Sequence, residues 1–423
     1  MTSTAPRTAS PEGGRPIELA RCLVVVLSGE SRGKEYLLTG DICRVGKARD
    51  NHIVLEDETV SRYHFEIVRE PKGFLLRDTG STNGTQLDGS EIREAYLKTL
   101  SVVTAGTVQM KLRSFVERID RKPSEVDRFG EAVGRSPEMR EVFGILAKVA
   151  PTDSTVLLTG EPGTGKDLLA RAIHAASPRA AKPLVRVDCA GPLAALEGEL
   201  FGFERGAGAL SPRPGAFEAA SGGVVYLDEV GELPLEAQPK LLRALAQREV
   251  RRVGGQRSIR IDARIVASTR KDLGAEVERG KFLAELRFRL AACQVAIPPL
   301  RARASDVSLL VEQATGRAPE RAVVEWLSRH DWPGNVRELH AIVGRDSAGG
   351  DAASGTGGGF RTGASFREEK ERWEADFERR YLIWLMRCAK GNVSQAAREA
   401  RMDRKYLHKL LKKHGVQLRE GHE

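Results

Sequence analysis

A chain of 423 residues is long enough for two to four domains, each with its own buried core. Its net charge of +9 favours an anionic partner, and its longest apolar runs, such as "CLVVVL", are far too short for a membrane-spanning helix. The five cysteines are scattered and form no C-x-x-C pair, which speaks against a disulfide framework or a zinc site and predicts reduced, mostly buried thiols. We therefore expect a cytoplasmic protein with no membrane partner.

Changes in composition divide the chain into segments. Residues 1–20 open with "MTSTAPRTASPEGGRP", which lacks apolar periodicity and predicts a disordered leader. A Gly/Ser/Ala-rich stretch predicts a flexible linker over residues 343–365. The other segments are a short-strand domain at 21–116, a charged linker at 117–132, alternating strand and helix patterns at 133–342, and helix patterns alone at 366–419. We expect a multidomain protein with a β-sandwich, an α/β domain and an all-α domain.

The first domain contains brief β-branched runs broken by Gly, Asp and Asn, which is typical of an all-β sandwich or barrel. The motifs "RVGKARDNHIVLEDETVSRYHFEIV" and "LLRDTGSTNGTQLDG" resemble the forkhead-associated (FHA) domain, whose signature is a G-R, an S-x-x-H and an N-G at this spacing. The resemblance implies a phosphothreonine reader in which Ser61 and Arg62 hold the phosphate while Thr82 and Asn83 fix the peptide backbone. The alternative is that "STNGT" and "DGS" are ordinary hairpin turns.

Two positions of this domain qualify the resemblance. Lys47 stands where the family has arginine, so the charge is kept but the bidentate fork is lost and the affinity for phosphate is expected to be weaker. His64 is expected to buttress the serine loop as a hydrogen-bonding group and not to touch the ligand.

The middle segment begins with "STVLLTGEPGTGKDLLARAIH", a β-branched strand, a G-x-x-x-x-G-K loop and an amphipathic helix. Its glycines let backbone N–H groups turn toward phosphates, and Lys166 reaches the β and γ oxygens. About sixty residues later "GGVVYLDE" supplies a second acidic strand, in which Asp228 would hold Mg²⁺ and Glu229 would orient the attacking water. ATP and Mg²⁺ are thus the predicted cofactors. The expected binding residues are Gly160, Glu161, Pro162, Gly163, Thr164, Gly165, Lys166, Asp167 and Asp228.

From "VGRSPEMREVFGILAKVAPTDSTVLLTGEPGTGKD" to "HDWPGNVREL" the chain resembles the AAA+ ATPases of bacterial enhancer-binding proteins, the activators of sigma-54 RNA polymerase. The resemblance implies a P-loop ATPase domain with a small helical lid that assembles as a dimer or a hexameric ring. It also assigns Arg337, in "WPGNVREL", to the sensor that touches nucleotide, and Arg289 to a trans-acting arginine finger. In this family, ATP turnover remodels the closed polymerase complex.

Four control positions depart from the family pattern. Asp188 replaces a switch asparagine, Arg270 replaces the asparagine of the first sensor, and Leu283 replaces one of two trans-acting arginines. The loop at residues 206–211, "GAGALS", lacks the phenylalanine and threonine of the family's G-A-F-T-G-A segment, which pushes on sigma-54. An arginine finger contributes roughly 10³ to 10⁵ in rate, so we expect ATP to bind but to turn over slowly.

The last segment predicts three helices. The first carries an apolar stripe at helical spacing, expected to be a dimer or core face, and Asp403 is placed to cap the third helix. The segment resembles the Fis-type helix-turn-helix domain, which implies binding in the DNA major groove. Base-edge contacts are expected from Arg404, Lys405 and His408, and phosphate contacts from Lys409, Lys412 and Lys413.

Two functions remain open from the sequence. The first is a sigma-54-dependent activator with a phosphopeptide-sensing domain, an ATPase and a DNA-binding domain. The second is a phosphopeptide-gated DNA-binding regulator that uses ATP for assembly and does not remodel sigma-54 polymerase. The motif order favours the first function, and the four departures favour the second.

Overall fold

The computed structural model describes residues 17–38, 40–119, 121–206, 211–343, 378–379, 381–383, 385–386, 389, 392–400 and 402–415. It divides into two compact units. The first comprises Met1–Glu161 with Gly165–Pro298, and the second comprises Pro162–Thr164 with Pro299–Glu423. Each unit is considered by itself below.

The first unit begins with a β-sandwich, as expected from the short β-branched runs. One sheet has the strand order β2-β1-β11-β10-β7-β8 and the other β4-β3-β5-β6-β9. In β11 buried and exposed residues alternate at its start, so the apolar side chains of one face enter the sandwich core. The strands are β1 (Ile17–Val26), β2 (Glu35–Leu38), β3 (Ile42–Gly46), β4 (Ile53–Val54), β5 (Phe65–Glu70), β6 (Gly73–Asp78), β7 (Thr85–Leu87), β8 (Ser90–Ile92), β9 (Glu94–Tyr96), β10 (Leu100–Ala105) and β11 (Val108–Ile119).

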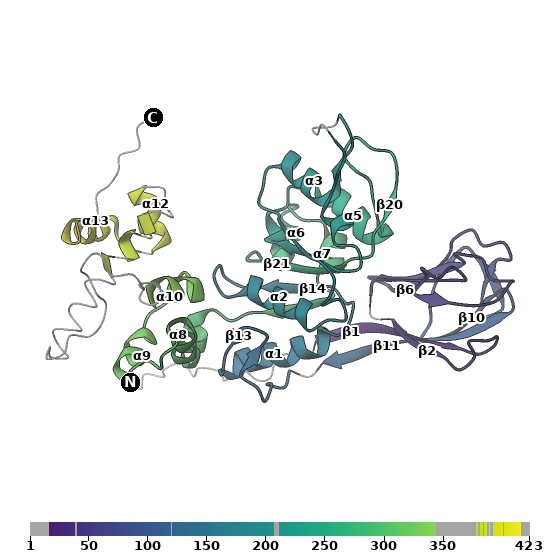
Figure 1. Ribbon diagram of the computed structural model, residues 1–423, viewed down its shortest axis with the longest axis horizontal. Coiled ribbons are helices and arrows are strands. Elements are labelled where there is room, and N and C mark those ends of the chain that lie inside the picture. The colour runs from purple at the N-terminus through teal and green to yellow at the C-terminus, as the bar shows by residue number, and fades with distance from the viewer. Residues whose placement is uncertain are drawn as a thin grey trace, which may run out of the picture. The chain divides into compact units, whose positions relative to one another are not determined.

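The outer ends of β1 and β11 reach further than the sequence analysis expected. β1 starts at Ile17, within the expected leader, and pairs there with Ile119, within the expected linker. Figure 1 shows the two strands running side by side as a long ribbon. Leu19 and Ile119 are each 3% exposed and belong to the apolar core of the α/β domain. The two strands are longer than predicted because these two side chains are buried. The polar residues around them had indicated a leader and a linker.

The rest of the first unit is an α/β domain around a parallel sheet of order β15-β18-β21-β14-β22. Separate apolar clusters pack on the sheet, one of them built around α1 and α2 and the other around α3, α5 and α7. Its sheet strands are β14 (Val156–Thr159), β15 (Leu184–Asp188), β18 (Val224–Asp228), β21 (Arg264–Thr269) and β22 (Cys293–Ala296). Its helices are α1 (Pro137–Val149), α2 (Lys166–Ala175), α3 (Leu193–Phe201), α4 (Ala216–Ala219), α5 (Gln238–Gln247), α6 (Leu273–Glu278), α7 (Ala284–Leu290) and the 3₁₀ turn η1 (Val230–Glu232).

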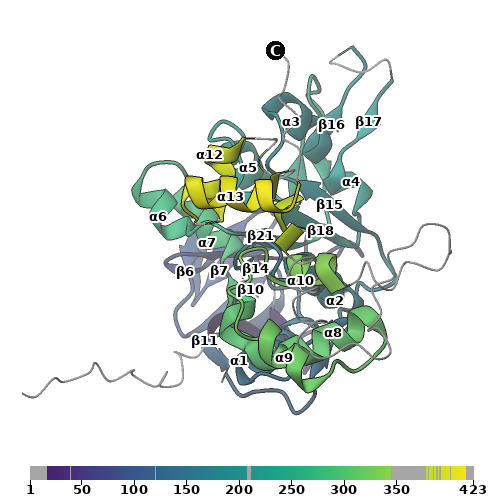
Figure 2. The same cartoon turned by 90° about the vertical axis from the view of Figure 1, so that its left-hand side faces the viewer.

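Three two-stranded ribbons stand beside this sheet. They are β12 (Arg128–Phe129) with β13 (Ala132–Val133), β16 (Gly202–Phe203) with β17 (Arg213–Pro214), and β19 (Glu249–Val250) with β20 (Ile259–Arg260). Figure 2 shows β16 and β17 next to α3 and α4. Residues 207–210, in the loop whose sequence lacks the family's phenylalanine and threonine, lie outside the described residues.

The second unit is helical. Its elements are η2 (Leu300–Asp306), α8 (Val307–Thr315), α9 (Arg321–Leu327), α10 (Asn335–Val343), α12 (Val393–Glu399) and α13 (Arg404–Lys413). Asp403 caps α13 as predicted, because its carboxylate accepts hydrogen bonds from the backbone N–H groups of Lys405 and Tyr406. Most of the predicted aromatic stripe, including Phe366, Trp373, Phe377, Trp384 and Cys388, lies outside the described residues.

The expectation for the cysteines is confirmed where it can be followed. Cys22, Cys43, Cys189 and Cys293 are free and buried. In the part of the chain that is described, no helix combines the length and apolarity that crossing a bilayer requires.

Candidate functional site

The G-x-x-x-x-G-K loop follows β14 and leads into α2, as the sequence predicted. Gly163 and Gly165 have φ values of 78° and 106°, in the left-handed region that favours glycine. A Cβ atom on Gly163 would lie 2.2 Å from the carbonyl oxygen of Gly334, so the loop also needs glycine for a close backbone approach. The loop is therefore built as a cradle of backbone N–H groups at the start of a helix.

Lys166 and Glu229 meet at the carboxyl ends of the parallel strands. The Lys166 ammonium lies 3.2 Å from the Glu229 carboxylate and donates to the carbonyl of Gly160 at 2.9 Å. Glu229 has a φ of 50°, which is unusual for a residue with a side chain, and its N–H donates to the Ser268 hydroxyl at 3.2 Å. Because β21 lies between β14 and β18, its end supplies the group that holds the acidic turn in place.

Asp228 is held by three side chains. Its Oδ1 accepts hydrogen bonds from Tyr226 at 2.9 Å and from Ser268 at 2.5 Å, and its Oδ2 accepts from Arg186 at 2.5 Å. Burial alone would raise the pKa of Asp228, but the hydrogen bonds from Ser268, Arg186 and Tyr226 outweigh it and hold the pKa below its ordinary value. Asp228 is therefore an anion at neutral pH, as a magnesium ligand must be.

The side chains present fit a magnesium ion that enters with a nucleotide. Among the described residues, no group of three or more His, Cys, Asp or Glu side chains is arranged to hold a metal by itself. Mg²⁺ in nucleotide sites takes one or two carboxylates and completes its octahedron with phosphate oxygens and water. Asp228 offers one such carboxylate, and Asp167 lies on the same side, since Arg186 approaches both acids.

Arg270 and Asp188 are two of the four positions at which the sequence differs from the family pattern, and both hydrogen-bond to nearby groups. The guanidinium of Arg270 pairs with Glu232 at 2.8 Å, while its backbone N–H donates to the Glu229 carboxylate at 3.0 Å. Asp188, which replaces the switch asparagine, accepts a hydrogen bond on Oδ1 from the N–H of Ala190 at 3.0 Å. Thus Arg270 orients Glu229 through its backbone N–H, which any residue type except proline could supply at this position.

The two predicted catalytic arginines lie in different settings. Arg289, on α7, has a side chain that is only 4% exposed, and its Nε and Nη1 have no hydrogen-bond partner among the described residues. A finger that acts on a neighbouring subunit must reach the surface, so this role requires Arg289 to turn outward and remains a prediction. Arg337, on α10, is exposed, and its backbone N–H donates to the carbonyl of Gly163 at 3.3 Å. Asn335 adds a hydrogen bond to the carbonyl of Pro162 at 3.1 Å.

The five predicted phosphopeptide residues come from three loops that meet. The Ser61 hydroxyl accepts from the N–H of Thr82 at 3.0 Å, and the N–H of Lys47 donates to the carbonyl of Ser61 at 3.0 Å. Asn83 donates to the carbonyl of Thr59 at 2.8 Å, and the side chains of Lys47 and Arg62 are exposed beside this junction. The arrangement places two cations next to a serine hydroxyl, which is chemistry that suits a phosphate.

Gly46 and His64 fix the geometry of this junction. A Cβ atom on Gly46 would lie 2.4 Å from the carbonyl oxygen of Arg62, so only glycine allows the two loops to approach. His64 is fully buried, accepts the N–H of Ser61 on Nδ1 at 3.1 Å, and places Nε2 3.1 Å from the carbonyl of Gly84. His64 therefore links the serine loop to the N-G turn, which agrees with the structural role expected from the sequence.

The sandwich should lose stability in mild acid because of His64. Burial lowers the pKa of His64 below its ordinary value of 6.5, and a proton on Nδ1 would break the bond from Ser61. Since the unfolded chain binds this proton more readily, the contribution of neutral His64 is complete above about pH 6.5 and is lost as the pH falls further. The midpoint of thermal unfolding, followed by circular dichroism, should fall more steeply from pH 7 to pH 5.5 in the wild type than in His64→Gln. Equal slopes in the two proteins would contradict this prediction.

The predicted DNA-contacting residues lie together on α13. Arg404, Lys405, His408, Lys409, Lys412 and Lys413 are all exposed, while Leu407 and Leu411 are buried on the opposite side of the helix. The Lys413 ammonium, however, forms an ion pair with Glu378 at 2.8 Å, which partly neutralises its charge. The other side chains form the basic face that a recognition helix needs.

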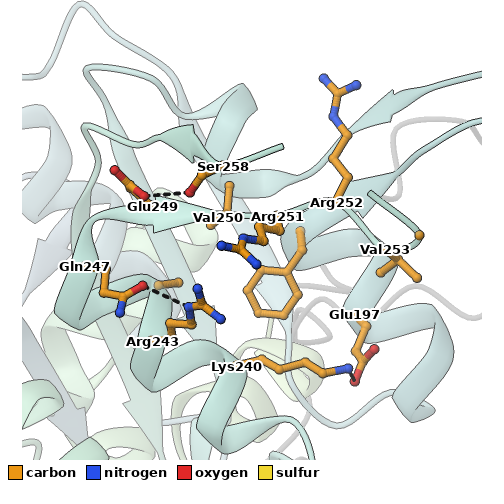
Figure 3. Close-up of a pocket in the computed structure, with 13 residues that line it drawn as sticks. Glu197, Lys240, Arg243, Gln247, Glu249, Val250, Arg251, Arg252, Val253 and Ser258 are labelled. Atoms are coloured by element: carbon orange, nitrogen blue, oxygen red, sulfur yellow. Dashed lines mark hydrogen bonds and ion pairs between the residues drawn. The ribbon is translucent and has the colours of Figure 1, made fainter. Parts of the chain in front are cut away.

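A cavity of about 300 Å³ lies apart from these residues, between α3, α5 and β19. Figure 3 shows Lys240 beside Glu197, Arg243 beside Gln247, and Ser258 beside Glu249 on its walls. These polar groups bond one another in pairs across the cavity wall.

Arg186 is the functional candidate that the sequence analysis missed. Arg186 stands two residues before Asp188, the switch position of the family, and residues two apart on a strand share a face, so the alternation could have pointed to Arg186 too. Ser268 and Tyr226 gave no comparable signal, because hydroxyl groups within buried apolar strands are common.

Comparison with known proteins identifies the family. The sigma-54 interaction domain family matches residues 132–296, and the family described as "Inner membrane component of T3SS, cytoplasmic domain" matches residues 25–115. The Nif-specific regulatory protein of Azotobacter vinelandii is 47% identical over 227 residues, which are 51% of this chain and 44% of that protein. The chain spans 34% and 48% of two further relatives, so it covers less than half the length of all three.

Longer matches also exist. NtrX from Brucella abortus, solved in complex with ATP, is 35% identical and superposes with a TM-score of 0.48 over 69% of this chain and 71% of that chain. Solved FHA domains are 29% and 32% identical over 22% of this chain, with a TM-score of 0.21. The transcriptional regulatory protein GlrR of Escherichia coli (strain K12) is 38% identical over 317 residues, which are 69% of this chain and 70% of GlrR. The chain therefore belongs to the sigma-54-dependent transcriptional regulators.

Proposed function

We propose that this regulator binds ATP with Mg²⁺, binds a promoter-upstream DNA site through α13, and reads a phosphothreonine peptide with its FHA domain. The observation that carries the proposal is the meeting of Lys166, Glu229 and Asp228 at the carboxyl ends of the parallel strands, beside a glycine-rich loop. A cation for phosphate, an acid for metal and an acid for water are the parts that a P-loop ATPase needs. In the proposed cycle, subunits assemble as a dimer or a ring, and ATP turnover remodels sigma-54 polymerase.

Contacts within the first unit support a link between phosphopeptide and nucleotide. Arg260, on β20 of the AAA+ domain, places its guanidinium 4.0 Å from the ring centre of Tyr63 and 3.4 Å from Asp50. Tyr63 directly follows Arg62 and donates to the Asp50 carboxylate at 2.7 Å. A phosphate bound at Ser61 and Arg62 would therefore act on a residue next to the one that contacts the ATPase domain.

The second candidate function is a regulator in which ATP controls assembly alone. Leu283 stands where the family has an arginine, and it packs against the apolar core, so it offers no charge to a neighbouring nucleotide. The loop at residues 206–211 lacks the family's phenylalanine and threonine, so no aromatic side chain is present there to bury against a partner. Under this alternative ATP binds, turns over slowly and drives no remodelling.

Open-complex formation distinguishes the two functions. The purified full-length chain should form open complexes with sigma-54 polymerase on a sigma-54 promoter that carries its binding site, and only when ATP is present. Glu229→Gln should abolish the open complexes and leave DNA binding unchanged, because it removes only the group that orients the water. Permanganate footprinting of melted thymines measures the result. If DNA and ATP bind but no open complex forms, the second function replaces the first.

A further inference from the structure

Arg186 covers the oxygen of Asp228 that a metal would use. β15 and β18 pair in parallel with Arg186 opposite Tyr226 and Asp188 opposite Asp228, so Arg186 lies two residue pairs away from the acid, a span that its long side chain bridges. Its Nη2 donates to Oδ2 of Asp228 at 2.5 Å. Asp228 has a side chain that is only 14% exposed, so this is a contact to a largely enclosed carboxylate.

The other carboxylate oxygen of Asp228, Oδ1, is already occupied by hydrogen bonds and is not open to a metal. Oδ1 already accepts from both Tyr226 and Ser268, and these hydroxyls come from within the sheet, so they cannot leave without disturbing β18 and β21. Arg186, by contrast, lies on the edge strand of the sheet, and its side chain is 56% exposed. Of the three groups that bond Asp228, only Arg186 has room to move away.

Arg186 also lies near the second acid of the site. Its Nε is 3.9 Å from Oδ1 of Asp167, the residue that directly follows the P-loop lysine. Lys166 meanwhile pairs with Glu229, so the acids around the phosphate position are matched by cations from the chain itself. The site is thus charge-compensated as it stands, and an incoming divalent cation must replace one of these compensating charges.

We propose that Arg186 is the counter-ion of the metal site: it holds Oδ2 of Asp228 in the nucleotide-free protein, and the metal that accompanies ATP displaces it. This inference rests on the proposed function, since it takes Asp228 as the metal ligand. Arg186 is a positioning residue. It competes with the metal for Asp228 and thereby lowers the affinity of the site for the metal.

The competing explanation is that Arg186 binds a phosphate oxygen directly. The two explanations predict opposite signs. Without a competing counter-ion, metal binds more tightly to the nucleotide complex, whereas the loss of a phosphate ligand weakens nucleotide binding with or without metal.

Arg171 provides a matched control. It pairs with the other oxygen of Asp167 at 3.1 Å, and its side chain is 57% exposed, almost the same as the 56% of Arg186. Arg171→Ala therefore removes the same charge from the same acidic neighbourhood but leaves the contact to Asp228 intact.

The experiment measures Mn²⁺ binding to the full-length protein in the presence of the non-hydrolysable analogue AMP-PNP, using the electron paramagnetic resonance signal of free Mn²⁺. Arg186→Ala should bind Mn²⁺ about threefold to tenfold more tightly than the wild type, the range for loss of a partly exposed ion pair at an enclosed carboxylate. Arg171→Ala should change the affinity by less than about twofold. Arg186→Lys, which keeps the charge but not the guanidinium geometry, should fall between the wild type and Arg186→Ala.

Each other outcome has a definite meaning. Unchanged or weaker Mn²⁺ binding by Arg186→Ala, with AMP-PNP still bound by the wild type, overturns the counter-ion proposal and leaves the proposed function standing. Equal tightening by Arg186→Ala and Arg171→Ala also overturns it, because general charge removal would then be the cause. If the wild type binds no AMP-PNP at all, the proposed nucleotide function fails first.

Discussion

Lys166→Ala should lower the affinity for ATP by about 100-fold or more, which is about 2.7 kcal/mol of binding free energy. Lys166 is 7% exposed and is held by the carbonyls of Gly160 and Glu161 and by Glu229. Its removal takes away the cation that faces the β and γ phosphates and leaves the negative charge of Glu229 uncompensated beside them. Isothermal titration calorimetry with ATP and Mg²⁺ measures the change.

The control for this prediction is Arg171→Ala, which removes a positive charge five residues further along the same helix. It should bind ATP within about threefold of the wild type, because an exposed ion pair contributes little. Far-ultraviolet circular dichroism should show the same helix content in both variants. An affinity of Lys166→Ala that stays within threefold of the wild type would mean that the loop does not hold the triphosphate.

The largest expected effect on stability comes from Arg264→Met. Arg264 is 1% exposed, and its guanidinium donates to three carbonyls at the end of α1 and beyond it, those of Val149, Ala150 and Ser154. Methionine fills similar space but donates no hydrogen bond, so three carbonyls each lose a charged donor at about 1 to 3 kcal/mol, and the Val149 carbonyl keeps only its bonds from Thr152. We expect a loss of about 3 to 6 kcal/mol in the free energy of unfolding of the first unit, and a fall of about 10 °C in its unfolding midpoint.

Differential scanning calorimetry of the full chain checks this result. Arg243→Met is the comparison, since Arg243 is exposed on α5 and bonds only its neighbour Gln247 among the described residues. That variant should stay within about 0.5 kcal/mol of the wild type. A similar small effect for Arg264→Met would show that water replaces the lost donors.

Local motifs sufficed to predict which residues meet at the proposed nucleotide site. The glycine loop and the acidic strand are each recognisable over a few residues, because phosphate binding needs glycine backbone and a helix start, and metal binding needs an acid at a strand end. The same holds for the FHA loops, where Ser61 and Thr82 meet at 3.0 Å although twenty-one positions separate them. The sequence alone could not reveal the contacts that surround these residues, because they depend on which strands are neighbours.

Several results depended on such neighbours. Arg186 reaches Asp228 only because β15 pairs with β18, and Ser268 reaches both acids only because β21 comes next in the sheet. The trans-acting role of Arg289 remains a prediction, but the sequence did not indicate that its side chain is only 4% exposed. Lys413 remains a predicted DNA contact, but it pairs with Glu378, a residue 35 positions earlier in the chain.

By itself, the sequence predicted three kinds of domain, the G-x-x-x-x-G-K loop with its acids, the loops around Ser61 and Thr82, and the basic helix. Each of these depends on spacing along one stretch of chain, and short-range periodicity and backbone chemistry fix such features. Only the tertiary structure decided which charge faces which acid, where the β1–β11 ribbon ends, and which arginines are buried. Those features follow from the order of the strands in the sheet and from burial, which bring together residues that lie far apart in sequence.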